Sequence, residues 1–104
     1  MLNSRKIVIH FISDQPSNVS LKTNAKNKVC AGTAVSFECS AVANPLVHTY
    51  LLYENNVIVS NMGHLGTVVR EMENAGEYAF RCEANNSIQE LSRSRNIMLT
   101  VTGK

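Results

Sequence analysis

Apolar and polar residues alternate in several short runs along this chain. The clearest runs are residues 35–40, 49–53, 78–84 and 96–101, in which every second position is apolar and the positions between are mostly polar. A period of two residues is that of a β-strand with one buried and one solvated face. The pattern therefore predicts antiparallel strands that each pack one face into a core.

Turn-forming residues separate these runs at short and regular intervals. The turns are expected at Ala31-Gly32, Asn44-Pro45, Asn55-Asn56, residues 61–66 and Asn74-Ala75-Gly76. Many short strands joined by such turns, with few helix patterns between them, are typical of two-layer β folds. The sequence therefore predicts an all-β protein, either a sandwich or a barrel.

The composition fits one globular domain with its own core. The chain has 104 residues, of which 44% are hydrophobic and 17% charged. The net charge is only +2 and the basic residues are scattered, which argues against a nucleic-acid partner. No run approaches the roughly 18 apolar residues of a membrane-spanning helix, so we expect no direct membrane contact.

The first 14 residues have two interpretations, which the sequence leaves open. Residues 4–11 align with residues 94–101 at one constant offset, which is about the length of a sandwich domain. Residues 1–14 are then an extension, a linker or the last strand of a preceding domain, and residues 15–104 are the domain itself. Alternatively, residues 7–12 are the first strand of this domain. They lack the cleavage site of a signal peptide, so a secreted native protein would contain this chain as an excised fragment.

Three segments carry a resemblance to a known family. They are Gly32-x-x-Val35-x-Phe37-x-Cys39, Asn74-Ala75-Gly76-Glu77-Tyr78 and Phe80-Arg81-Cys82-Glu83-Ala84-Asn85-Asn86. Through them, residues 15–102 resemble the immunoglobulin superfamily in its constant-like or intermediate sets. The resemblance implies a two-sheet antiparallel Greek-key sandwich of about seven strands. The 43 positions from one cysteine to the other leave no room for the extra strands of variable-type domains.

The chain departs from the family pattern at two core positions. It has no tryptophan, and Leu52 stands where the family usually buries one. Leucine buries less area, so we expect a core weaker by about 1–2 kcal/mol. Phe80 stands two positions before Cys82, where family members usually have a tyrosine that hydrogen-bonds to the preceding turn. We expect Tyr78 to replace that tyrosine.

The resemblance also implies a disulfide bond between Cys39 and Cys82 that joins the two sheets. Such a bond would restrict the unfolded chain by roughly 4 kcal/mol. Cys30 is left over, because it lies out of phase with the inward-facing positions of the strand that follows. For Cys30 the sequence leaves open a half-buried free thiol and a bond to a neighbouring domain or second chain.

Two sequons for N-glycosylation occur, Asn18-Val19-Ser20 and Asn85-Asn86-Ser87. We expect Asn18 at an exposed N-terminal edge and Asn85 in a turn after a strand, where a glycan could project from each. Together with the implied disulfide bond, the sequons predict an extracellular location, either at the cell surface or secreted.

Residues for catalysis or metal binding show no pattern typical of a site. Asp14 is the one aspartate, and His10, His48 and His64 lie far apart without the spacing of metal ligands. Gly63-His64-Leu65-Gly66 lacks the lysine and the helix of a phosphate-binding loop. We therefore expect no enzymatic activity, no metal site and no cofactor.

The resemblance favours protein recognition as the function. If Tyr50 and Leu52 face the core, a candidate protein-binding face points outward, composed of Leu51, Tyr53, Arg81, Glu83 and Met98. Aromatic, Met and Arg side chains are enriched at interfaces. We expect an extracellular recognition or cell-adhesion module of a larger multi-domain protein, with neighbouring domains in the same chain. Its partner would be another protein, either a cell-surface ligand or a second copy.

Two other interpretations remain. One is a structural spacer in a tandem array, which the similarity between residues 4–11 and 94–101 favours. The other is an intracellular muscle-type immunoglobulin domain, in which the cysteines would stay reduced.

Overall fold

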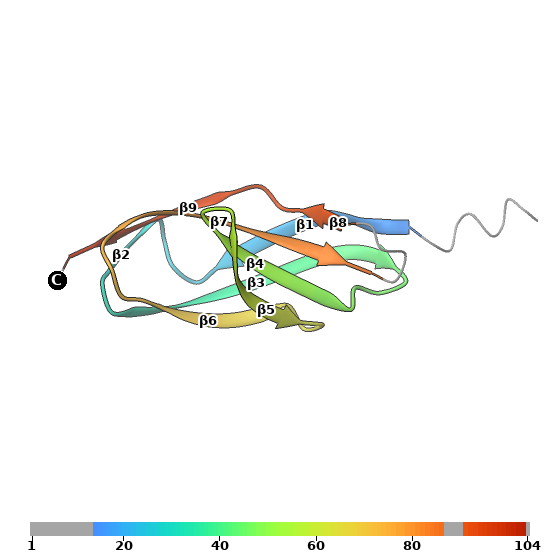
Figure 1. Cartoon of the computed structure of the whole chain (residues 1–104), viewed down its shortest axis with the longest axis horizontal. Helices are drawn as coiled ribbons and strands as arrows, with labels where there is room; N and C mark the ends of the chain where they lie inside the picture. The colour runs from blue at the N-terminus through green and yellow to red at the C-terminus, as the bar shows by residue number, and fades with distance from the viewer. Residues whose placement is uncertain (1–13, 87–90, 104) are drawn as a thin grey trace, which may run out of the picture.

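The computed structural model describes residues 14–86 and 91–103, and these residues form two facing β-sheets (Figure 1). Residues 1–13, whose assignment the sequence left open, lie outside the described part. The described residues form nine strands and contain no helix able to cross a membrane. The strands are β1 (Asp14–Thr23), β2 (Lys28–Cys30), β3 (Thr33–Asn44), β4 (Thr49–Glu54), β5 (Val57–Gly63), β6 (Thr67–Met72), β7 (Gly76–Asn85), β8 (Leu91–Arg93) and β9 (Ile97–Thr102).

One sheet has three strands in the order β1-β3-β6, and the other has six, in the order β2-β9-β7-β4-β5 with β8 also paired to β7. Every pairing is antiparallel except that of β2 with β9, which is parallel. Consecutive strands change sheet after β1, β2, β3, β5 and β6, as in a Greek-key sandwich. Two of the nine strands, β2 and β8, have only three residues each. The predicted all-β, two-sheet sandwich with about seven main strands is therefore confirmed.

The core consists of the alternate side chains that the sequence pattern placed inward. They are Val35, Phe37 and Cys39 of β3, Tyr50 and Leu52 of β4, Phe80, Cys82 and Ala84 of β7, and Leu99 and Val101 of β9. The apolar residues alternate because successive side chains of a strand point to opposite faces, and only one face packs against the opposite sheet. Leu52 is completely buried and lies directly opposite Cys82 in the β4–β7 pairing, as expected of the residue that replaces the tryptophan.

The disulfide bond between Cys39 and Cys82 is present and joins β3 to β7, one strand from each sheet. The Cα atoms of the two cysteines are 6.2 Å apart, within the usual range for a disulfide. The pairing that the family resemblance implied is therefore confirmed.

The β4–β5 hairpin turns through Asn55 and Asn56, which both have positive φ angles of 51° and 69°. Asparagine tolerates this region better than most residues, so the pair suits a two-residue hairpin. Asn55 also attaches the hairpin to β7, because its Oδ1 accepts a hydrogen bond from the Ala79 amide at 2.9 Å. Its own amide donates to the Ala79 carbonyl at 2.8 Å. The turn predicted here is confirmed.

Gly66 lies where the chain leaves the six-stranded sheet for β6. Its φ is +73°, and a Cβ at this position would overlap the carbonyl oxygen of Cys39. Its own carbonyl accepts a hydrogen bond from the Cys39 amide at 2.7 Å. The crossover therefore passes so close to a disulfide cysteine that only glycine fits.

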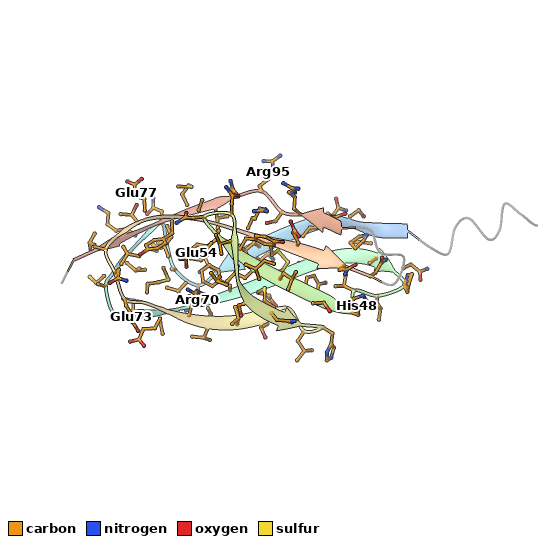
Figure 2. All side chains as sticks on the ribbon, in the orientation of Figure 1. His48, Glu54, Arg70, Glu73, Glu77 and Arg95 are labelled. Carbon is orange, nitrogen blue, oxygen red and sulfur yellow. A yellow bond between two sulfur atoms is a disulfide. The ribbon has the colours of Figure 1, made fainter. Side chains whose placement is uncertain are left out.

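An ion pair also links the two sheets. Arg70 of β6 and Glu54 of β4 meet between the sheets, with Nη2 3.1 Å from Oε1 (Figure 2). Both side chains are partly exposed, so solvent screening limits the pair to about 1 kcal/mol at most. Its main role is to hold β6 against β4, since these strands share no backbone ladder.

Tyr78 forms the hydrogen bond that Phe80 cannot. The Tyr78 hydroxyl donates to the carbonyl oxygen of Asn74 at 2.7 Å, four residues back in the turn before β7. Phe80 is fully buried in the core instead. The expectation that Tyr78 replaces the usual tyrosine is confirmed.

Removing this hydroxyl gives a first test. Tyr78→Phe is expected to lower the free energy of unfolding by about 1 kcal/mol, because one side-chain hydrogen bond is lost while the ring stays in place. Urea unfolding of both proteins measures the difference. Tyr50→Phe is the matched control, since no hydrogen bond from the Tyr50 hydroxyl is seen within the described residues; an equal loss in both variants would contradict the role of Tyr78.

Candidate functional site

The strand register brings the five predicted surface residues together on the outer face of the six-stranded sheet. Leu51 and Tyr53 of β4 lie opposite Glu83 and Arg81 of β7, respectively. Met98 of β9 lies opposite Ala79, two residues before Arg81 on the same face. These five residues are called the recognition patch below. The prediction that they share one face is consistent with the register.

Three members of the recognition patch interact closely. The Tyr53 hydroxyl donates a hydrogen bond to Glu83 Oε1 at 2.9 Å. Arg81 Nη2 lies 3.4 Å from Glu83 Oε2. The Arg81 guanidinium also lies 4.1 Å from the centroid of the Tyr53 ring, in the range of a cation–π contact. Each side chain therefore fixes the other two.

This network corrects one part of the prediction. The sequence placed Arg81 and Glu83 on a solvated face, but Glu83 is only 6% exposed. The reason is that the long side chains of Tyr53 and Arg81 fold across the sheet and cover the carboxylate, which they also neutralise and hydrogen-bond. Met98, by contrast, is 58% exposed, in agreement with the outward position expected from the sequence.

The network also changes the chemistry of Tyr53. Partial burial raises the pKa of the Tyr53 hydroxyl above its ordinary value of 10.0, and the hydrogen bond to the Glu83 carboxylate raises the pKa further. Arg81 and Arg93 act in the opposite direction by favouring the phenolate. The hydroxyl therefore stays protonated and keeps donating to Glu83 at physiological pH.

Three residues beside the recognition patch were not predicted. Asn56 Oδ1 accepts a hydrogen bond from Arg81 Nη1 at 3.2 Å. Ile58 of β5 lies opposite Tyr53, and Arg93 of β8 lies opposite Glu83. The tight Asn55-Asn56 turn could have indicated Asn56 and Ile58, because a two-residue hairpin places β5 beside β4. No alternation marks the three-residue β8, so Arg93 had no signal.

Cys30 is a free and exposed cysteine. Of the two interpretations, the half-buried thiol is therefore wrong. The reason is that β2 is a separate edge strand paired in parallel to β9, and Cys30 lies at its end rather than inside the β3 pairing. An intermolecular bond remains a prediction.

The two sequon asparagines differ in accessibility. Asn18 is exposed on β1 and has a positive φ of 53°. The expectation that Asn85 lies in a turn after the strand is wrong, because Asn85 is the last residue of β7 and is half-buried. Its Oδ1 is buried without a hydrogen-bond partner within the described residues. Glycosylation stays a prediction at both positions, and the exposed Asn18 is the better acceptor. Ser87 of the second sequon lies outside the described residues.

Groups of three or more residues able to bind a metal ion are absent from residues 14–86 and 91–103. His48 and His64 are both exposed, at different turns. His10 lies outside the described part of the chain.

No family model and no curated protein matches the sequence. Among solved structures, the chain is similar to fibronectin(III)-like modules of CbhA from Clostridium thermocellum. The TM-score is 0.69 and the identity 14%, over 79% of this chain and 94% of the other. The chain is also similar to part of a polysaccharide lyase, with a TM-score of 0.55 and 23% identity, over 80% of this chain but 12% of the lyase. At such identities the similarity shows the fold alone: an immunoglobulin-like β-sandwich.

Proposed function

We propose that this chain is an extracellular protein-recognition module of the immunoglobulin superfamily, built into a larger multi-domain protein. In this proposal it has no enzymatic activity and binds another protein through the recognition patch. The disulfide bond supports an oxidising, extracellular environment. The match to only 12% of the polysaccharide lyase illustrates that such a sandwich can be one part of a longer chain.

The observation that carries the proposal is the fixed arrangement of Tyr53, Arg81 and Glu83 beside the exposed Met98. Binding costs conformational entropy for every long side chain that must be ordered. Arg81 is already held by Tyr53, Glu83 and Asn56, so less entropy remains to be lost when a partner binds. Arginine, tyrosine and methionine are also residues that interfaces favour.

The competing function is a structural spacer in a tandem array. One observation favours it: β1 begins at one end of the sandwich and the C-terminus lies at the other (Figure 1). A chain that enters and leaves at opposite ends can connect neighbouring domains in a line. A spacer needs no partner on the recognition patch. A binding experiment therefore distinguishes the two functions.

The test is binding of the multimerised chain to an array of secreted ectodomains, followed by affinity measurement for each hit. Met98→Asp places a charge in the recognition patch and is expected to weaken binding at least about tenfold. Val69→Asp is the matched control, because Val69 is equally exposed but lies on β6 in the other sheet. Melting temperatures of both variants confirm folding.

Equal affinity of Met98→Asp and the unchanged chain would exclude the recognition patch as the binding site. Absence of any binding ectodomain would favour the spacer. Loss of binding in Met98→Asp alone would support the proposal.

A further inference from the structure

The edge strands of the two sheets differ in how they are protected against pairing with another chain. An edge strand exposes unpaired backbone N–H and C=O groups, which proteins commonly guard with charges, proline, short length or β-bulges. In the three-stranded sheet, β1 contains Pro16 and Lys22, and β6 contains Arg70 and Glu71. In the six-stranded sheet, β2 is only three residues long and contains Lys28.

β5 is different from these edges. It is the last strand of the six-stranded sheet and has seven residues, Val57-Ile58-Val59-Ser60-Asn61-Met62-Gly63, with no charge and no proline. Irregularities in the β4–β5 register increase its twist but add no charge to its free edge. The edge away from β4 has no strand partner among the described residues.

Exposed apolar side chains lie at both ends of this strand. Seven large apolar residues are exposed in the described part of the chain, and three of them lie on β5 or in the turn that follows it. These are Val57 at 62%, Ile58 at 52% and Leu65 at 72% exposure. An edge without charge or proline that also carries apolar side chains is the combination that favours strand addition from another chain.

We propose that β5 is a self-association edge, at which two copies of this chain pair antiparallel about a two-fold axis. A second copy matches the edge in charge, because both strands are neutral and no like charges oppose each other. The two copies of β5 also match in polarity, because Val57 and Ile58 of each copy would lie beside an equally apolar strand. The two-fold arrangement satisfies both free edges at once and stops further growth. This inference goes beyond the recognition patch and does not depend on it.

Sedimentation velocity over a concentration series, from about 1 μM to about 1 mM, tests the proposal. All variants are made in a Cys30→Ser background, so that a disulfide between copies contributes nothing. The parent is expected to shift from monomer to dimer with rising concentration. Ile58→Lys places a charge on the paired edge strand of each copy and is expected to weaken the dimer at least about tenfold. Val69→Lys, an equally exposed valine on the β6 edge strand, is the control and should dimerise as the parent does.

Hydrogen exchange at the two ends of the series locates the contact. Protection that rises with concentration in residues 57–63 is expected, because their free amides become paired. A monomer at every concentration, or equal dimerisation of Ile58→Lys and the parent, would overturn the proposal. So would protection confined to β7 and β9, which would place the contact on the sheet face. A chain lacking residues 1–13 should still dimerise; its failure to do so would identify that segment as the occupant of the edge instead.

Discussion

Cys82→Ala is expected to lower the free energy of unfolding by about 4 kcal/mol, or to prevent folding at 37 °C. The bond to Cys39 closes a loop of 43 positions, and its loss returns that conformational freedom to the unfolded chain. A domain of 104 residues has only about 5–15 kcal/mol of stability in total. The missing tryptophan leaves less core area to compensate. Urea unfolding under non-reducing conditions measures the loss.

Two controls separate the bond from the side chains. Cys39→Ala/Cys82→Ala should lose about as much as either single variant, because one cross-link is removed in every case. Cys30→Ser should change stability by no more than about 0.5 kcal/mol, since Cys30 is exposed and unbonded. A melting temperature of Cys82→Ala equal to that of the parent would contradict a stabilising disulfide.

The parts of the fold that could be predicted from the sequence are those with a repeating pattern. The alternation in β3, β7 and β9 gave the correct inward faces, because these strands place alternate residues in the core, although β7 also buries Glu83 on its other face. The Asn55-Asn56 hairpin could be predicted because its positive φ angles limit which residues fit. The disulfide pairing rested on the family resemblance rather than on spacing alone.

The parts that could not be predicted depend on contacts between distant segments. β2 is three residues long, too short to show a period, and it exists because it pairs in parallel with β9 some 70 residues later. The same non-local pairing exposes Cys30. The burial of Glu83 depends on Tyr53 and Arg81 folding over it. A pattern of two residues shows which face a side chain occupies but not which neighbours cover it.

The free edge of β5 is another feature that the alternation of residues could not predict. Its residues are apolar enough to look like part of the core in the sequence, yet Val57 and Ile58 are exposed. Whether a strand is central or at an edge is decided by the sheet order, which alternation does not encode. The sheet order, and not the alternation, therefore determines that β5 has a free edge.

Phe80→Ala is expected to cost about 3–5 kcal/mol of stability. Phe80 is completely buried, and its ring centroid lies 4.5 Å from that of Phe37, which comes from the opposite sheet. Truncation removes the buried ring and leaves a cavity that two sheets joined by a disulfide cannot readily close. Urea unfolding measures the loss, and Val57→Ala, on an exposed site, should stay within about 0.5 kcal/mol of the parent.

Phe80→Tyr decides whether this position could ever serve as the family's tyrosine. The substitution restores the residue that the resemblance expects two positions before Cys82. The Tyr78 hydroxyl already donates to the Asn74 carbonyl, however, and the Phe80 ring lies wholly within the core. The new hydroxyl would be buried without a partner, so Phe80→Tyr is expected to destabilise the domain by about 1–3 kcal/mol. A gain in stability would instead show that the new hydroxyl reaches the turn. Position 80 could then form the hydrogen bond to the turn that Tyr78 forms now.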